Sequence, residues 1–261
     1  MNTHLPSPLD IRLMNLATGA LLVTFVLLGA LTLSRWISRM PAFDLQGIAV
    51  TGDVTHNNAL TLRANVAPRL SGTFFTVDLA KVRSAFESVP WVRHAIVRRE
   101  FPNRLRVALQ EHQAVGYWGD EGEPRLINSF GEVFEANTGE LDQDSLPRLN
   151  GPEGQGQEVL EMYRTLAPHF QTMQLSIDAL DLSRRGSWSV RLDGGAAMEL
   201  GRGTREEVSE RTQRFLKTLT QVVSKYGRQA NSIESADLRH DNGYAIRLRG
   251  VSTQIPEPGK K

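Results

Sequence analysis

The sequence predicts an α+β protein in which a single N-terminal membrane-spanning helix precedes a large folded part. Three observations lead to this prediction: an uncharged apolar run near the N-terminus, a segment ordered strand–helix–helix–strand–strand, and a longer, mainly antiparallel strand-rich segment with two amphipathic helices. The formal net charge of +1 over 261 residues is far from the basic excess typical of nucleic-acid-binding proteins. The absence of cysteine excludes disulfides, thiolate zinc sites and cysteine nucleophiles.

The apolar run extends from Leu13 to Leu33 without a charged residue. At about 1.5 Å per residue, a helix of this length spans roughly the 30 Å of a bilayer's hydrocarbon core. A helix of a soluble protein would show polar residues at a period of 3.6, and a cleavable signal peptide normally has a shorter apolar region followed by small residues. The run has neither pattern, so we expect an uncleaved transmembrane helix at residues 13–34, after an N-terminal segment at residues 1–12.

Flanking charge does not orient this helix. Arg12 lies before it, partly offset by Asp10, and Arg35 and Arg39 lie after it. The positive-inside rule compares the lysines and arginines of short flanks, and here the two flanks are almost equal. Both orientations therefore stay open on charge alone.

A first folded domain is expected at residues 43–112, after a juxtamembrane linker at residues 35–42. It opens with an apolar strand, and Asn57 or Asn58 is the candidate N-cap of the short helix that follows. Two strands joined by a Pro-Asn-Arg turn complete the domain. The order strand–helix–helix–strand–strand is compact enough to form a domain by itself.

The second helix of this domain has the clearest periodicity. Its apolar residues recur at spacings of 3, 4 and 3, which places them on one helical face: Leu79, Val82, Phe86 and Val89. Thr76 or Asp78 is expected to cap the helix, and Pro90 is expected to end it.

Residues 113–250 are expected to form a second domain, mostly of strands, with two amphipathic helices. Periodicity predicts the apolar face of the later helix: Val208, Phe215, Leu216, Leu219, Val222, Val223 and Tyr226. Thr204 and Glu207 are spaced as a capping box at its start, and Gly227 suits the position just past its end. The tail at residues 251–261, which has two prolines and two terminal lysines, is expected to be disordered.

No set of catalytic, metal-binding or cofactor-binding residues is found. The six histidines are scattered, and neither a Gly-x-Ser-x-Gly motif nor a Walker loop occurs. The run Gly201-Arg202-Gly203-Thr204 lies between a strand and a helix, where a phosphate could bind. A tight turn into a capped helix explains this run without a ligand. We therefore expect no cofactor and no enzymatic activity.

Two features favour binding to other molecules. Five arginines cluster on the predicted hairpin at residues 91–112: Arg93, Arg98, Arg99, Arg104 and Arg106. They either form a solvated face that keeps an edge strand soluble or attract anionic lipid or a partner. The second feature is the last predicted strand, at residues 244–249, because no later segment follows to pair with it. It is either a free edge that recruits a strand from another chain or an edge protected by Arg247 and Arg249.

The most specific stretches are GTFFTVDLAKVRSAFESVPWVRHAIVRREFPNRLRVALQEHQAVGYW at residues 72–118, LPRLNGPEG at residues 146–154, SWSVRLDGG followed by ELGRG, and DLRHDNG from Asp237. Together with the apolar run, they resemble the FtsQ/DivIB family of bacterial cell division proteins. The resemblance covers the anchor and nearly all of the remaining chain. It departs at Gln113-Ala114, where the family commonly has a proline, and this change should affect only the entry into the next strand.

The resemblance implies a fold, a location and a role. It implies that residues 43–112 form a POTRA domain and residues 113–250 a β-domain, both in the periplasm, with the N-terminus in the cytoplasm and one helix in the inner membrane. Members of the family are scaffolds at the division septum. They bind FtsB and FtsL in a subcomplex and connect it to FtsK and to the peptidoglycan synthase pair FtsW/FtsI.

The resemblance also implies a binding surface, on which FtsB adds a strand to the last strand of the β-domain. The residues of this surface are Arg185, Arg239, His240, Asn242, Gly243, Tyr244, Ala245, Ile246, Arg247 and Leu248. A tyrosine is usual at the position of His240 and a serine at that of Asn242, which bears on side-chain contacts but not on main-chain pairing. Arg98 and Arg99 are the candidates for a second surface.

Two other classes of protein are weighed against this scaffold. A POTRA-containing component of a transport or secretion system is the first alternative, but such proteins usually carry tandem POTRA repeats or a barrel, whereas this sequence has one such module and no series of lipid-facing strands. A membrane-anchored hydrolase is the second alternative, and it requires a nucleophile and a base, for which the sequence offers no set.

Overall fold

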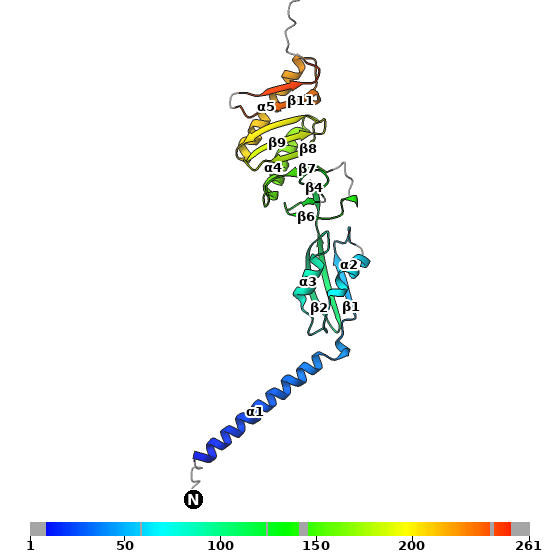
Figure 1. Ribbon diagram of the computed structural model, residues 1–261, viewed down its shortest axis with the longest axis vertical. Helices are drawn as coiled ribbons and strands as arrows, with labels where there is room; N and C mark the ends of the chain where they lie inside the picture. The colour runs from blue at the N-terminus through cyan, green and yellow to red at the C-terminus, as the bar shows by residue number, and fades with distance from the viewer. Residues whose placement is uncertain (1–8, 58, 124, 141–145, 241–242, 252–261) are drawn as a thin grey trace, which may run out of the picture. The chain divides into compact units, whose positions relative to one another are not determined.

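The structure is a computed structural model that divides into two compact units, Met1–Glu111 and His112–Lys261 (Figure 1). It describes residues 9–57, 59–123, 125–140, 146–240 and 243–251. The predicted tail lies outside the described residues apart from Val251, and so do Asn58 and Asn242. Each unit is considered by itself below.

The first unit begins with the long helix α1, Leu9–Ser38, which contains the predicted apolar run. Its stretch from Leu13 to Ser38 is long and apolar enough to cross a membrane. The hydroxyl groups of Thr18, Thr24 and Thr32 each donate a hydrogen bond to the backbone carbonyl four residues earlier. Because these polar groups are satisfied inside the helix, they cost little in a hydrocarbon environment. The sequence and the structure thus agree on one N-terminal helix suited to be a membrane anchor.

The rest of the first unit is the first domain, residues 43–111, which confirms the predicted order of elements. Its strands and helices are β1 Gly47–Gly52, α2 Ala59–Val66, α3 Leu79–Glu87, β2 Val92–Glu100 and β3 Arg104–Glu111. A short turn of 3₁₀ helix, η1 Pro41–Phe43, precedes β1, and η2 Ala67–Arg69 follows α2. The sheet has the order β1-β3-β2, with β1 parallel and β2 antiparallel to β3. The two helices supply the crossover that a parallel pair requires.

One face of this sheet packs against the helices. The predicted helix face is confirmed, since Val82 and Phe86 are buried and Asp78 caps α3 by accepting hydrogen bonds from two backbone amides. The buried core is contributed by both helices and by the strands: Leu62, Val66, Val77, Val82, Ala85, Phe86, Val89, Val92, Ala95, Leu105, Val107 and Leu109. Leu105, Val107 and Leu109 alternate along β3, as expected for a sheet covered on one face. In β2, an irregularity between Val92 and His94 separates the core residues Val92 and Ala95 by three positions.

The second domain, residues 112–251, contains one sheet of nine strands among the described residues, ordered β12-β11-β10-β9-β8-β7-β4-β5-β6. The strands are β4 Ala114–Trp118, β5 Arg125–Asn128, β6 Val133–Glu135, β7 Arg148–Asn150, β8 Ile177–Leu182, β9 Ser187–Leu192, β10 Ala197–Arg202, β11 Ile233–Asp237 and β12 Ala245–Leu248. Five neighbouring pairs are antiparallel and three are parallel. The prediction of a mainly antiparallel domain is therefore confirmed.

Helices α4, Gly156–Gln171, and α5, Arg205–Lys225, pack against the sheet and share its core. The predicted capping box is present at the start of α5, where Thr204 and Glu207 satisfy each other's backbone amides. The predicted apolar face of α5 is wrong at one position, because the Tyr226 side chain is 48% exposed. Tyr226 is the C-cap residue, so the helical period that placed it on the buried face no longer applies there.

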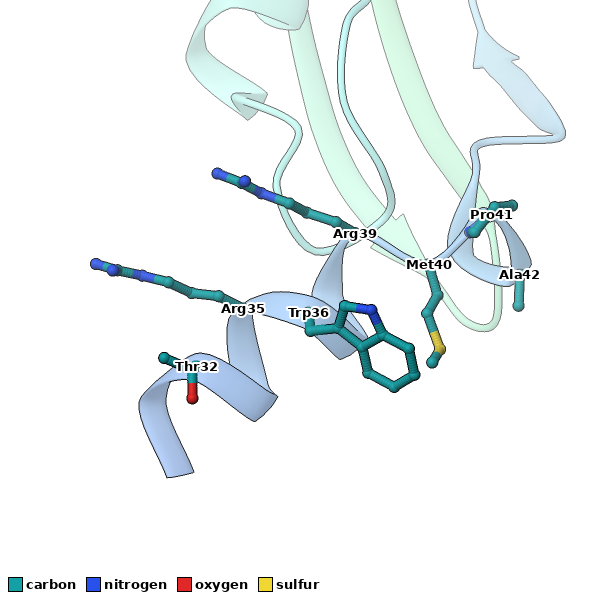
Figure 2. A pocket seen from close by; sticks show the side chains of 7 residues that line it. All are labelled: Thr32, Arg35, Trp36, Arg39, Met40, Pro41 and Ala42. Atoms are coloured by element: carbon teal, nitrogen blue, oxygen red, sulfur yellow. The ribbon is translucent and has the colours of Figure 1, made fainter. Parts of the chain in front are cut away.

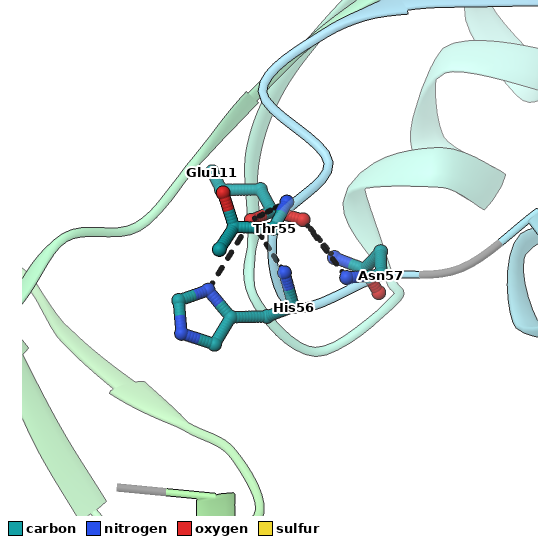
Figure 3. A network of polar contacts seen from close by, with 4 residues as sticks. All are labelled: Thr55, His56, Asn57 and Glu111. Carbon is teal, nitrogen blue, oxygen red and sulfur yellow. Dashed lines mark hydrogen bonds and ion pairs between the residues drawn. The ribbon is translucent and has the colours of Figure 1, made fainter.

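A buried carboxylate closes the first domain at its last residue (Figure 3). The Glu111 side chain is only 5% exposed and accepts hydrogen bonds from the backbone amides of Thr55, His56 and Asn57 at 3.0–3.1 Å. It also binds the Asn57 side-chain amide at 2.8 Å and lies 3.3 Å from Nδ1 of His56. Asn57, one of the two candidate caps of the helix that follows, donates its side-chain amide to Glu111. The network fastens the loop between β1 and α2 to the end of β3.

The same loop is held from its other side by an aromatic contact. The His56 ring stacks on the Trp91 ring, with centroids 4.0 Å apart and planes within 9° of parallel.

Burial raises the pKa of Glu111, but the hydrogen bonds from His56 and Asn57 outweigh this effect, and the net pKa lies below its ordinary value. The carboxylate is therefore ionised at neutral pH and is the centre on which the loop depends.

Replacing Glu111 by alanine should lower the free energy of unfolding by about 2–3 kcal/mol, because several buried donors lose their acceptor. Denaturation of the full chain in detergent, together with amide hydrogen exchange of residues 55–57, measures both the global and the local loss. Glu100→Gln is the matched control, since Glu100 belongs to an exposed pair with Arg106 and such pairs contribute little. Unchanged exchange in Glu111→Ala would contradict this role.

The contribution of Glu111 should also depend on pH. Its folded pKa lies below its unfolded value, so the stabilisation is complete above the unfolded pKa and is lost as the pH falls through the folded one. The difference in melting temperature between the wild-type chain and Glu111→Gln should therefore be largest at neutral pH and shrink in acid. A difference that grows as the pH falls would contradict the assignment.

Candidate functional site

The candidate interaction site of the second domain is the outer edge of its sheet, formed by β12. This strand pairs with β11 alone among the described residues, in the antiparallel register that places Asp237 opposite Ala245 and Ile233 opposite Leu248. A strand in this position has one row of backbone groups directed away from the sheet. The fold therefore places the last predicted strand at an edge.

The hydrogen bonds of β12 identify which of its backbone groups face outward. The backbone amide of Arg249 donates to the carbonyl of Ser232 at 2.9 Å, so the backbone groups of Arg249 are directed toward the β11 side. Because backbone direction alternates along a strand, Arg247 also faces β11, whereas Ile246 and Leu248 face outward. The Leu248 carbonyl accepts from the amide of Val251 at 3.3 Å. Among the described residues no strand lies on the outer side of β12, where the Ile246 amide and carbonyl and the Leu248 amide are directed.

Side chains alternate along β12 as well, and those of Tyr244, Ile246 and Leu248 attach the strand to the core. Leu248 is buried, and Tyr244 and Ile246 are partly buried against the same core. The Tyr244 ring packs edge-on against Phe215 at 4.8 Å, and its hydroxyl lies 2.8 Å from that of Thr218 in α5. Tyr244 therefore has a structural role that the sequence did not reveal. The edge is thus held in place by contacts with its own domain.

The strand register brings most of the other predicted site residues to one end of this edge. Asp237 lies opposite both Ala245 and Glu199, and Gly201 lies opposite Trp188, at the start of β9. The loop that joins β11 to β12 and the turn between β8 and β9 therefore leave the same end of the sheet. They carry the exposed residues Arg239, His240, Gly243 and Arg185. The predicted residue Asn242 lies outside the described part of the chain.

One of these residues, Arg239, is already paired within the chain. Its Nε donates to Oδ1 of Asp237 at 2.9 Å, and its Nη2 donates to Oδ2 at 2.6 Å. These side-chain bonds, and a further bond from the Arg239 backbone amide, lower the pKa of Asp237 to about 2. The guanidinium is thereby held at the end of the edge, where a partner's carboxylate would compete with Asp237 for it.

The two arginines predicted as a second surface lie on opposite faces of the first domain's sheet. Arg98 is opposite Arg106, on the open face. Arg99 is directed to the helix side, where its guanidinium donates to the backbone carbonyls of Phe74 and Val77 at 2.7 and 2.8 Å. The structure thus separates the pair and gives Arg99 an internal role. Alternation along the strand could have revealed this separation from the sequence.

The turn that could have held a phosphate is filled by the chain itself. The guanidinium of Arg211 donates to the carbonyls of Leu200 and Arg202, so a side chain from α5 occupies the turn. Gly201 and Gly203 both have positive φ angles, 84° and 138°, which explains why glycine is needed at both positions. Over the described residues, no group of three or more His, Cys, Asp or Glu side chains is placed to hold a metal ion.

Comparison with known proteins assigns both domains to one family. Residues 43–112 match the family model described as "POTRA domain, FtsQ-type". Residues 116–239 match the model described as "Cell division protein FtsQ/DivIB, C-terminal". The two matches together cover well over half of the chain.

Relatives with similarity over nearly the whole length agree with this assignment. The chain is 43% identical to "Cell division protein FtsQ" of Burkholderia pseudomallei, over 93% of this chain and 94% of the relative. It is 36% identical to the protein of the same name from Thiomonas arsenitoxydans over the full length of both, and 37% identical to that of Bordetella pertussis over 92% of each. The chain therefore belongs to the FtsQ/DivIB family of cell division proteins.

Proposed function

We propose that this protein is a scaffold of the bacterial division machinery, anchored in the inner membrane by α1 with residues 1–12 in the cytoplasm and both domains in the periplasm. Its proposed role is to connect early and late division proteins at the septum and to control septal peptidoglycan synthesis. Family membership and an apolar helix suited to be an anchor support this proposal. The orientation rests on the family resemblance, since the flanking charges leave it open.

The proposed contact is strand addition to β12. The observation that carries it is the terminal position of β12 in the sheet, with outward backbone groups at Ile246 and Leu248. The proposed partner is FtsB, which together with FtsL would form a subcomplex with this chain. FtsK and the FtsW/FtsI pair are the proposed neighbours on either side of that subcomplex. Each added main-chain hydrogen bond contributes about 0.5–1.5 kcal/mol net, so a short added strand needs side-chain contacts in support.

Replacing Ile246 by proline should weaken the complex with the periplasmic segment of FtsB from the same bacterium. Proline removes an outward amide and leaves a partner carbonyl unpaired, which costs about 1–3 kcal/mol, or roughly 5- to 150-fold in Kd. Ile246→Ala is the matched control, because it removes the same packing but keeps the amide. Equal Kd values for the two folded variants, measured by titration calorimetry, would exclude pairing at this position.

Changes at the Asp237–Arg239 pair should alter binding in opposite directions. Arg239→Gln removes the cation and should weaken an acidic partner's binding, whereas Asp237→Asn frees the guanidinium and should strengthen it. In the unbound protein, an NMR titration should give Asp237 a pKa of about 2, rising toward 3.8 in Arg239→Gln. The pairing is complete above the ordinary pKa and is lost as the pH falls toward 2. Binding that is unchanged in both variants would remove Arg239 from the contact surface.

A fluorescent protein fused to the N-terminus should form a mid-cell band in constricting cells when the fusion replaces the native copy. It should fluoresce from the cytoplasm because residues 1–12 are proposed to lie there. A fusion of residues 1–42 alone carries the anchor without either domain and is the control for uniform distribution. A full-length fusion that is spread evenly over the envelope would contradict the scaffold role.

A further inference from the structure

The first domain carries exposed aromatic side chains at the end where the chain arrives from α1. The side chains of Phe75 and Phe101 are 48% and 75% exposed. Both pack edge-on against the buried Phe74, with ring centroids 5.2 and 6.2 Å from it, and Phe75 also packs edge-on against Phe43 at 4.8 Å. Phe43, Phe74, Phe75 and Phe101 are called the aromatic tip below. Exposed apolar side chains that form one patch mark a surface that contacts a protein, a membrane or a ligand.

Hydrogen bonds fasten the aromatic tip to the chain that leaves α1. The hydroxyl of Thr73 donates to the carbonyl of Ser38, the last residue of α1, at 2.5 Å. The amide of Phe74 donates to the carbonyl of Phe43 at 2.7 Å. Phe43 follows Ser38 by five residues, a reach of at most roughly 18 Å. If α1 spans a bilayer, the tip lies within reach of the headgroup layer.

The loop that holds Phe75 is fixed by the protein itself. Arg99 donates to the carbonyls on both sides of it, at Phe74 and Val77, and the Thr73 amide donates to the hydroxyl of Thr76 at 2.9 Å. The backbone on either side of Phe75 is thus held by the Arg99 side chain, which reaches from β2 to the loop. A fixed apolar side chain loses little conformational entropy when it enters another phase.

Cationic and aromatic side chains also lie at the end of α1 (Figure 2). Arg35 and Arg39 are one helical turn apart and extend to the same side of the helix, while the Trp36 ring lies beside Met40 on the other side. With the neighbouring residues up to Ala42 they line an open groove of about 650 Å³. The Trp36 side chain is 63% exposed, and no acidic partner is found for either arginine within the described residues.

We infer that the aromatic tip and the Arg35–Arg39 pair together form a second membrane contact, which binds the headgroup layer of an anionic phospholipid bilayer. This inference rests on the membrane-spanning role proposed for α1. Aromatic rings with exposed edges favour the interfacial layer, and two unpaired guanidiniums complement lipid phosphates. Under the proposed orientation the arginines lie on the side that the positive-inside rule disfavours. A lipid-binding role accounts for their presence there.

Site-directed spin labelling of the full chain in lipid nanodiscs tests this inference, and the absence of cysteine makes each introduced thiol unique. Labels at Phe75→Cys and Phe101→Cys should show higher accessibility to oxygen and lower accessibility to a water-soluble nickel complex than a label at Ile96→Cys. Ile96 is the matched control because it is 57% exposed on the same domain. Both tip labels behaving as the Ile96 label does would overturn the inference.

A fourth label separates this result from a failure of the anchor. A label at Val26→Cys lies within α1 and should show the high oxygen accessibility and low nickel accessibility of the hydrocarbon core. If the Val26 label is in lipid but the tip labels are in water, the second contact alone is excluded. If the Val26 label is itself in water, the membrane-spanning proposal fails as well. If the tip labels become inaccessible to the nickel complex only after a partner protein is added, the aromatic tip binds that protein and the lipid contact is excluded.

The arginines are tested by lipid composition. In nanodiscs that contain phosphatidylglycerol and phosphatidylcholine, the preference for spin-labelled phosphatidylglycerol should fall by about fivefold for each of Arg35→Gln and Arg39→Gln at low ionic strength. Arg191→Gln removes one exposed arginine of the second domain and is the charge-matched control. Equal falls in all three variants would assign the preference to overall charge and would overturn the specific role of the pair.

Discussion

The antiparallel pairing of β12 with β11 is the interaction on which the candidate site depends. The backbone groups of β12 that face β11 form hydrogen bonds with it, and the backbone groups of Ile246 and Leu248 are directed away from the sheet. The same alternation directs Tyr244 and Leu248 into the core, where Phe215 and Thr218 receive the tyrosine. Side chains thus secure the strand while its backbone remains available. Without these side-chain contacts, β12 would be held in the sheet only by its hydrogen bonds to β11.

Local signals in the sequence were sufficient for much of this fold. The apolar spacing in α3, the cap at Asp78 and the capping box at Thr204 and Glu207 all depend on residues within one turn of each other, and the structure contains each of them. The family resemblance supplied the site residues. The strand register places the site residues that lie in loops, among those the structure describes, at the same end of the sheet. Tyr226 failed as a core prediction because helical periodicity does not extend past the end of a helix.

Interactions between distant segments were beyond such reasoning. Glu111 binds a loop more than fifty residues earlier in the chain, and no local pattern marks a glutamate as the acceptor for three consecutive amides. Arg99 reaches carbonyls at Phe74 and Val77 only because β2 passes beside that loop.

As neighbours in the sequence, Arg98 and Arg99 suggested one charged patch. The strand turns them to opposite faces, so composition alone misjudges what such a cluster offers.

The brevity of β12 has a kinetic consequence. With four residues, it presents few outward groups, so an added strand would be released quickly unless the partner were held nearby by other means. Confinement of both chains to one membrane would raise their effective concentration, and a contact too weak to persist between freely diffusing molecules would then be populated for most of the time. Such a contact stays readily reversible, so that an assembly built on it could be taken apart without unfolding any of its members.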